Sequence, residues 1–178
     1  VALGFMEHMD FLERNYAPTV SIESIRIALT IAATKGWSIR TADVTGAFLI
    51  PTVDPDAKPV YIVLPEILQH LIERDEIIVL GKTMYGLRSS PKQWNLEFTR
   101  ALVGEFGLHQ LPNQPCVYVD RIESPTLVLL LHVDDCLITG EEAKVESVTS
   151  FMRTKWKITE SQGDKQEFLG MNYRTDDL

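Results

Sequence analysis

The chain has few cysteines, no long apolar segment and fewer basic than acidic residues. Cys116 and Cys136 are its two cysteines, and neither lies at C-x-x-C spacing or near a histidine at ligand spacing. We therefore expect two buried free thiols in a reducing compartment. No apolar run reaches the roughly 18 residues that a membrane span requires, so we expect no membrane partner.

The shortage of basic residues limits the possible partners further. The 17 Lys and Arg against 25 Asp and Glu give a net charge of −8, which argues against broad non-specific affinity for nucleic acid. A length of 178 residues, with 45% hydrophobic content, is ordinary for a globular chain and sufficient for a core of its own. The sequence predicts a single domain over residues 1–178.

Two adjacent acids interrupt an apolar run within residues 131–138. The pattern predicts two strands joined by a two-residue turn, with Asp134 and Asp135 at the tip of the hairpin. Like charges side by side are costly in a buried setting unless a cation, such as a divalent metal, neutralises them. The alternative is that Asp is simply a favourable turn residue.

A third acid ends a stretch of alternating polar and apolar residues. Asp43 is followed by the small residues Thr45, Gly46 and Ala47, a turn that leaves backbone N–H groups open to an anion. Phosphoryl transfer on a polyphosphate needs carboxylates that hold Mg²⁺ and backbone donors that seat phosphates. The two segments together therefore favour such a site.

The remaining pattern predicts strands interleaved with helices. The first helix covers residues 22–35, with Ser21 as its N-cap and Gly36 as its stop. Ser90 and Pro91 open the second helix. The other expected elements are strands near 38–43, 60–64, 76–80, 116–119 and 168–173 and a helix over 141–156. This order indicates an α+β fold in which helices cover one face of a sheet.

Four motifs occur in a fixed order, within residues 43–49, 84–94, 132–135 and 168–173. Together they resemble the reverse transcriptase of Ty1/copia-type LTR retrotransposons, and residues 1–5 and 16–26 are similar to the entry from fingers to palm in that family. The resemblance implies a polymerase palm-like fold with partial fingers, in which an antiparallel sheet carries an Asp-Asp hairpin. It also implies an RNA-directed DNA polymerase that extends a primer 3′ end.

The resemblance implies a role for each acid. Asp43 and Asp134 would ligate two Mg²⁺ ions, with Mn²⁺ as a possible substitute. Asp135 would support them, and the Val44 carbonyl would contact the ion on the nucleotide side. In-line attack of a primer hydroxyl on an α-phosphate is the reaction that such a pair of ions serves.

The resemblance also implies nucleotide and primer contacts. Phe48 would lie under the incoming sugar and exclude a 2′-hydroxyl, although a Phe at a strand end is also an ordinary core residue. Gly86 and Arg88 would belong to a segment beneath the nucleotide, in which Arg88 would meet a phosphate, although residues 85–91 alone predict only a turn before a helix. Thr45, Gly46 and Ala47 would also bind the nucleotide. The primer contacts implied by the resemblance are His132, Val133, Phe168, Leu169, Gly170 and Met171.

Some positions depart from the family. His132 stands where Tyr is usual, and an isolated His in a hairpin is more often structural. Leu3 and Ser21 stand where basic residues are common, which weakens capture of a triphosphate.

As part of a Pol polyprotein, the chain would act with integrase and RNase H on an RNA or DNA template with primer and deoxynucleoside triphosphates. We expect it to be a fingers and palm piece truncated at both ends, without thumb, connection or RNase H. Its expected location is intracellular, in the cytoplasm and in a virus-like particle. The alternatives are an inactive remnant that keeps the palm fold, and metal-dependent phosphodiester hydrolysis, for which no general base is evident.

Overall fold

The computed structural model describes residues 16–53, 58–73, 76–161, 163 and 165–174. The chain divides into two compact units. The first unit contains residues 1–16 and 48–94, and the second contains residues 17–47 and 95–178. The opening motif at residues 1–5, with Leu3, lies outside the described residues.

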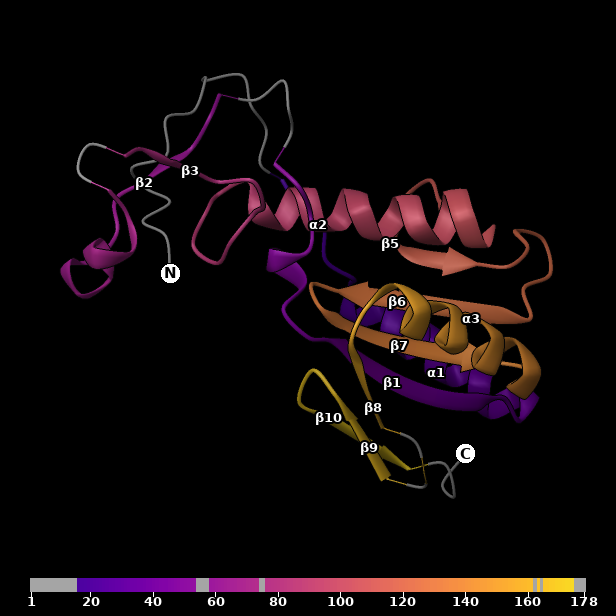
Figure 1. The fold of residues 1–178 in the computed structure, drawn as a ribbon. Coiled ribbons are helices and arrows are strands. Elements are labelled where there is room, and N and C mark those ends of the chain that lie inside the picture. Colours follow the sequence, from indigo (N-terminus) through magenta and orange to yellow (C-terminus); the bar gives the residue numbers. More distant parts are fainter. Residues whose placement is uncertain (1–15, 54–57, 74–75, 162, 164, 175–178) are drawn as a thin grey trace. The chain divides into compact units, whose positions relative to one another are not determined.

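A six-stranded antiparallel sheet forms the centre of the second unit (Figure 1). Its strand order is β4-β5-β6-β7-β1-β8, so β1 lies between β7 and β8. The strands are β1 (Ser38–Val44), β4 (His109–Leu111), β5 (Gln114–Val119), β6 (Leu127–His132), β7 (Asp135–Gly140) and β8 (Ile158–Ser161). The expected α+β fold is confirmed.

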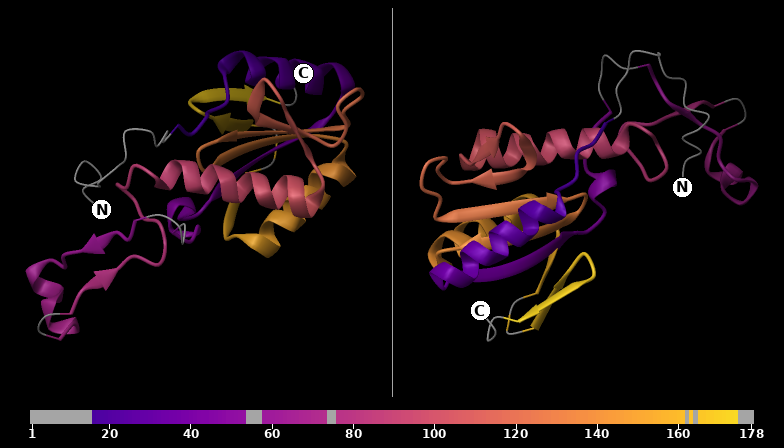
Figure 2. Two further views of the ribbon diagram at one scale, coloured as in Figure 1. Left: turned by 90° about the horizontal axis from the view of Figure 1, so that it is seen from above. Right: turned by 180° about the vertical axis from the view of Figure 1, so that it is seen from behind.

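Helices cover both faces of this sheet, so the expectation of one covered face is wrong. The helices α1 (Ile22–Lys35) and α3 (Glu142–Lys155) both contact β7 and lie on opposite faces of the sheet (Figure 2). Every residue of β6 from Leu127 to Leu131 is buried. Such a continuous apolar strand, without alternation, is typical of a sheet covered on both sides.

The ends of α1 follow the predicted capping pattern. The Ser21 side chain accepts a hydrogen bond from the Ser24 N–H at 3.2 Å. Gly36 ends the helix in the left-handed conformation with φ of 62°, which glycine adopts without steric cost. The predicted limits of this helix are confirmed.

Aromatic side chains pack the core on the face of the sheet opposite α1 (Figure 2). The helix α2 (Ser90–Thr99) continues as a π-helical segment, Arg100–Phe106. Phe98 stacks on Trp156 with 5.2 Å between ring centroids and meets Tyr118 edge-on at 5.8 Å. The Tyr118 hydroxyl and the Thr99 hydroxyl lie 2.8 Å apart, which satisfies this buried polar group.

A buried arginine ties β1 to α3 and β8. Only 5% of Arg40 is exposed, and its guanidinium contacts Glu146 at 2.7 Å, Glu142 at 3.3 Å and Glu160 at 3.5 Å. Arg153 joins the network through Glu146 and Glu160. Hydrogen bonds from Arg40 and Arg153 hold the pKa of Glu146 at about 2. We call these five side chains the Arg40 network.

The first unit contains a small two-stranded sheet. The strands β2 (Tyr61–Ile62) and β3 (Ile78–Val79) pair in antiparallel register and are shorter than the predicted strands over 60–64 and 76–80. A 3₁₀ helix, Glu66–Leu71, lies between them in the chain. Residues 51–53 are joined to residues 81–83 by backbone hydrogen bonds, including Thr83 N–H to Pro51 C=O at 3.0 Å.

The C-terminal part of the described chain departs from the prediction. Residues 168–173 do not form one strand, because β9 (Lys165–Phe168) and β10 (Met171–Arg174) form a hairpin. Leu169 and Gly170 make its turn, with φ of 50° and 74°. A two-residue turn with both φ values positive is type I′, which favours Asn and Gly. Because Leu stands in the first position, the local sequence did not indicate this turn. The short edge strands β4 and β8 were also not predicted.

No helix within the described ranges is long and apolar enough to cross a membrane. Cys116 and Cys136 are both buried and free, which confirms the prediction of two buried free thiols. Burial raises the pKa of the Cys116 thiol to about 11, so the thiol stays protonated near neutral pH.

Gly140 provides a test of the close approach between β7 and the start of β6. A Cβ at this position would lie 2.4 Å from the Thr126 carbonyl oxygen and 2.9 Å from the Leu127 Cα. We expect Gly140→Ala to lower the free energy of unfolding by about 1–3 kcal/mol in urea denaturation, because backbone atoms must shift. Gly104→Ala is the matched control, since a Cβ there meets nothing within 4 Å. Equal effects of the two substitutions would contradict this packing.

Candidate functional site

The structure brings the three acids together at one end of the sheet in the second unit. Asp43, the next-to-last residue of β1, pairs directly with Asp135, the first residue of β7. Asp134 lies in the turn before β7, and its carbonyl accepts a hydrogen bond from the Val44 N–H at 3.0 Å. Acids from distant parts of the sequence are therefore held next to each other by main-chain contacts.

The turn between β6 and β7 lies one residue earlier than expected. His132 pairs with Asp135, so Val133 and Asp134 are the two turn residues. Val133 has a φ of 59°, and a positive φ at the first turn position is the requirement of a type II′ turn, where Gly is usual. A β-branched residue in this conformation is a strained outlier, and such strain is concentrated at functional sites.

The acids form an electrostatically unfavourable cluster. All three are partly buried. Burial, and then the charges of Asp134 and Asp43, raise the pKa of Asp135, while His132 acts in the opposite direction. Burial and the charge of Asp134 also raise the pKa of Asp43. Negative charge gathered in this way favours a bound cation.

The donor atoms of the cluster fit a hard divalent cation such as Mg²⁺. Carboxylate oxygens from three acids are available, and Mg²⁺ prefers oxygen ligands. Within the described ranges, however, no three His, Cys, Asp or Glu side chains are already arranged to hold one ion.

A cavity of about 410 Å³ lies beside the acids. Its lining includes Asp43 and Asp135 together with Thr159 of β8 and the hairpin residues Phe168, Leu169 and Gly170. Thr159 pairs with Asp43 on the side opposite Asp135. Sequence reasoning missed Thr159, because β8 has only four residues and no apolar alternation to signal it.

The expected primer contacts differ in their exposure to solvent. Phe168 is buried, whereas 39% of Leu169 is exposed, and Met171 begins β10. The His132 side chain is only partly buried, but its Nδ1 atom is buried and has no hydrogen-bond partner among the described residues. An unsatisfied nitrogen beside Asp135 is a feature that the sequence alone did not indicate.

The turn that was expected after Asp43 is present at the end of β1. Thr45 and Gly46 form the turn, Gly46 has a φ of 70°, and Ala47 is buried. The Thr45 N–H donates to the Lys157 carbonyl at 2.9 Å. This donor is therefore used within the fold.

Phe48, Gly86 and Arg88 belong to the first unit. Phe48 is half-buried and its ring contacts that of Tyr85, with 5.2 Å between centroids. Gly86 follows with a φ of 95°, which favours glycine, and Arg88 is exposed. Sequence reasoning did not single out Tyr85.

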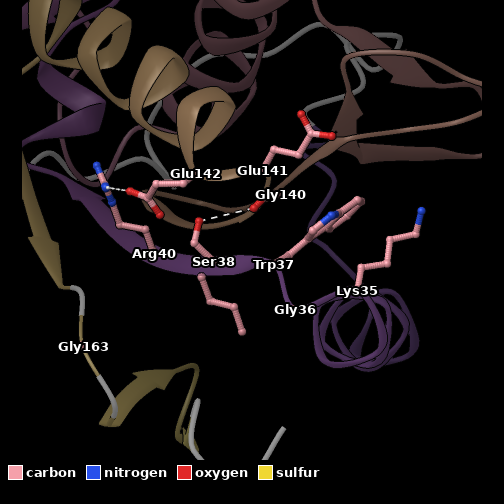
Figure 3. A pocket seen from close by; sticks show the side chains of 10 residues that line it. Lys35, Gly36, Trp37, Ser38, Arg40, Gly140, Glu141, Glu142 and Gly163 are labelled. Carbon is pink, nitrogen blue, oxygen red and sulfur yellow. Dashed lines mark hydrogen bonds and ion pairs between the residues drawn. The ribbon is translucent and has the colours of Figure 1, made fainter.

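A larger cavity, of about 880 Å³, lies around the start of β1 (Figure 3). Its lining includes Lys35, Trp37, Arg40, Glu141 and Glu142. Arg40 is already paired with Glu142, and the Ser38 hydroxyl donates to the Gly140 carbonyl at 3.3 Å. Arg40 and Ser38 are therefore already bonded within the fold, and we assign no ligand to this cavity.

Comparison with known proteins identifies related sequences over most of the chain. The family model described as reverse transcriptase (RNA-dependent DNA polymerase) matches residues 1–177. The chain is 30% identical over 174 residues to the Retrovirus-related Pol polyprotein from transposon TNT 1-94 of Nicotiana tabacum. It is 29% identical over 174 residues to that from transposon RE2 of Arabidopsis thaliana, and 26% identical over 139 residues to the Transposon Ty1-MR1 Gag-Pol polyprotein of Saccharomyces cerevisiae.

The chain corresponds to a small part of these relatives. The tobacco and Arabidopsis matches each cover 96% of the chain, and the yeast match covers 78%. The chain spans 13%, 12% and 7% of the respective polyproteins.

Removal of one charge provides a test of the electrostatics of the acid cluster. The raised pKa of Asp135 means that the folded state binds its proton more readily than the unfolded state. Stability is therefore lost as the pH rises from the ordinary Asp value of about 3.9 through the raised value. Without divalent cations, Asp135→Asn should raise the free energy of unfolding near neutral pH by up to about 1 kcal/mol, since solvent screening limits the gain.

Denaturation in the presence of a chelator, as a function of pH, measures this effect. Below the ordinary pKa range Asp135 is neutral, so the variant and the unmodified protein should then be equally stable. A loss of stability near neutral pH would show that the charge of Asp135 is compensated within the fold.

Proposed function

Since the chain belongs to the reverse transcriptase family of Ty1/copia-type Pol polyproteins, we propose that it adds deoxynucleotides to a primer 3′ end on an RNA or DNA template. The observation that carries the proposal is the pairing of Asp43 with Asp135, next to Asp134 in the turn. Three carboxylates at one end of a sheet are the set that two-metal phosphoryl transfer requires. We further propose a polymerase palm for the second unit, with the first unit contributing part of the fingers.

In this proposal the acids and Val44 hold the ions. Asp43 and Asp134 would be the ligands of both ions, Asp135 would support them, and the Val44 carbonyl would contact the ion on the nucleotide side. The Val44 N–H bond to the Asp134 carbonyl fixes the distance between the two ligand-bearing segments. When bound, two Mg²⁺ ions would lower the pKa of the primer hydroxyl and neutralise charge on the leaving pyrophosphate.

The turn after β1 seats the phosphates of the incoming nucleotide. The Thr45 N–H is already bonded to the Lys157 carbonyl, so we assign the backbone contacts to Gly46 and Ala47. Phe48 excludes a ribose 2′-hydroxyl, and Gly86 permits close approach of the backbone to the nucleotide. Arg88 supplies positive charge for a phosphate.

The cavity beside the acids is where we place the primer terminus. Its lining contains both Asp43 and Asp135 and the turn residues Leu169 and Gly170 of the β9–β10 hairpin. Phe168, Leu169, Gly170 and Met171 then position the primer, and His132 and Val133 contact it from the β6–β7 turn. Integrase, RNase H and the thumb would come from the rest of a Pol polyprotein, in a cytoplasmic virus-like particle.

Primer extension tests the proposed activity. In the full-length Pol protein that carries this chain, Asp134→Asn should reduce Mg²⁺-dependent extension by roughly a thousandfold, because a metal ligand of the transition state is lost. Glu123→Gln, at an exposed acid in a loop of the same unit, should leave extension unchanged. Incorporation of a labelled deoxynucleotide on a homopolymer template measures both.

Two outcomes would reject the proposal. Extension that survives Asp134→Asn would place the reaction elsewhere in the protein. No extension by the unmodified protein, with either Mg²⁺ or Mn²⁺, would favour an inactive descendant that keeps only the fold.

A further inference from the structure

Phe48 in the short 3₁₀ helix Ala47–Leu49 and Tyr85 in the turn before α2 form an aromatic pair at the surface of the first unit. The rings of Phe48 and Tyr85 lie 5.2 Å apart between centroids, at an interplanar angle of 57°. Phe48 is half-buried, and 39% of Tyr85 is exposed. We call these two residues the Phe48–Tyr85 pair.

A buried hydroxyl holds the main chain of Phe48. Thr83 is only 3% exposed, and its hydroxyl donates to the Phe48 carbonyl at 2.7 Å. The Thr83 N–H donates to the Pro51 carbonyl at 3.0 Å, so the loop after Phe48 is bonded to the strand-like segment before Tyr85. These bonds fix the position of the Phe48 backbone relative to that of Tyr85.

A second buried hydroxyl holds the main chain next to Tyr85. Ser90 is fully buried, and its hydroxyl donates to the Met84 carbonyl at 2.7 Å. The same carbonyl accepts the Leu87 N–H at 3.3 Å, which closes a turn around Tyr85 and Gly86. Both members of the pair are therefore carried by backbone that buried hydroxyls restrain.

The orientation of the Phe48 ring depends on its contact with Tyr85. A half-buried aromatic ring can occupy more than one staggered rotamer unless a neighbour blocks the alternatives. The tilted contact with Tyr85 is a favourable aromatic geometry, which stabilises the observed orientation of the Phe48 ring. A smaller side chain without a ring at position 85 removes this contact.

We propose that Tyr85 is a specificity-determining residue, which acts by positioning Phe48. It holds the Phe48 ring in the orientation that excludes a ribose 2′-hydroxyl, and thereby sets the preference for deoxynucleotides over ribonucleotides. The inference rests on the proposed polymerase function and on the role assigned to Phe48 there. Tyr85 itself needs no contact with the sugar.

The ratio of kcat/KM for a deoxynucleotide to kcat/KM for the matching ribonucleotide tests this role. Measurements use single-nucleotide incorporation by the full-length Pol protein that carries this chain. Tyr85→Leu should lower the ratio by about tenfold, the lower end of what one altered pocket contact produces. Tyr85→Phe keeps the ring and should keep the ratio.

Two further variants complete the comparison. Phe48→Val removes the ring that excludes the 2′-hydroxyl, and should lower the ratio at least as much as Tyr85→Leu. Tyr61→Leu is the matched control, because Tyr61 is 62% exposed in the same unit and lies in β2. It should leave the ratio unchanged.

The outcomes separate this inference from the proposed function. If the unmodified protein does not extend a primer, the proposed function and the inference both fall. If it extends a primer but Phe48→Val leaves the ratio unchanged, the role assigned to Phe48 and the inference fall, while the proposed polymerase activity stands. If Phe48→Val lowers the ratio but Tyr85→Leu does not, only the inference is overturned. If Tyr85→Leu lowers kcat/KM equally for both nucleotides, Tyr85 has only a structural role, and this outcome also overturns the inference.

Discussion

The antiparallel pairing of β1 with β7 is the interaction on which the candidate site depends. It sets Asp43 against Asp135 and joins Val44 to the Asp134 carbonyl. Because side chains alternate along a strand, a slip of one residue would turn Asp43 to the opposite face of the sheet. The apolar residues of β6 and β7, buried on both faces, oppose such a slip, so the core that stabilises the sheet also sets the geometry of the acids.

Unfavourable electrostatics at the acids are balanced by strong contacts elsewhere in the same sheet. The Arg40 network joins β1, α3 and β8 on the face that α3 covers. A buried arginine is stable only when its charge is paired, so β8 is tied to β1 by side chains as well as by main-chain bonds. β8 in turn places Thr159 beside Asp43. The acids can therefore remain close together although burial and repulsion raise the pKa of two of them.

Much of the second unit could be predicted from local sequence. Ser21 and Gly36 mark the ends of α1, because capping and a left-handed glycine are decided by neighbouring residues. Val145, Val148 and Met152 follow the helical period on one face of α3, and all three are buried. Features that depend on long-range contacts were missed, including the second covered face of the sheet and the edge strand β8.

The sequence by itself determined the elements, the acids at their ends and the family to which the chain belongs, since motif order and periodicity are properties of the sequence. Only the tertiary structure decided which residues meet. It placed the turn at Val133 and Asp134, Thr159 beside Asp43, and Tyr85 against Phe48. Strand register and contacts between loops depend on packing between segments far apart in the chain, and local patterns carry no information about that packing.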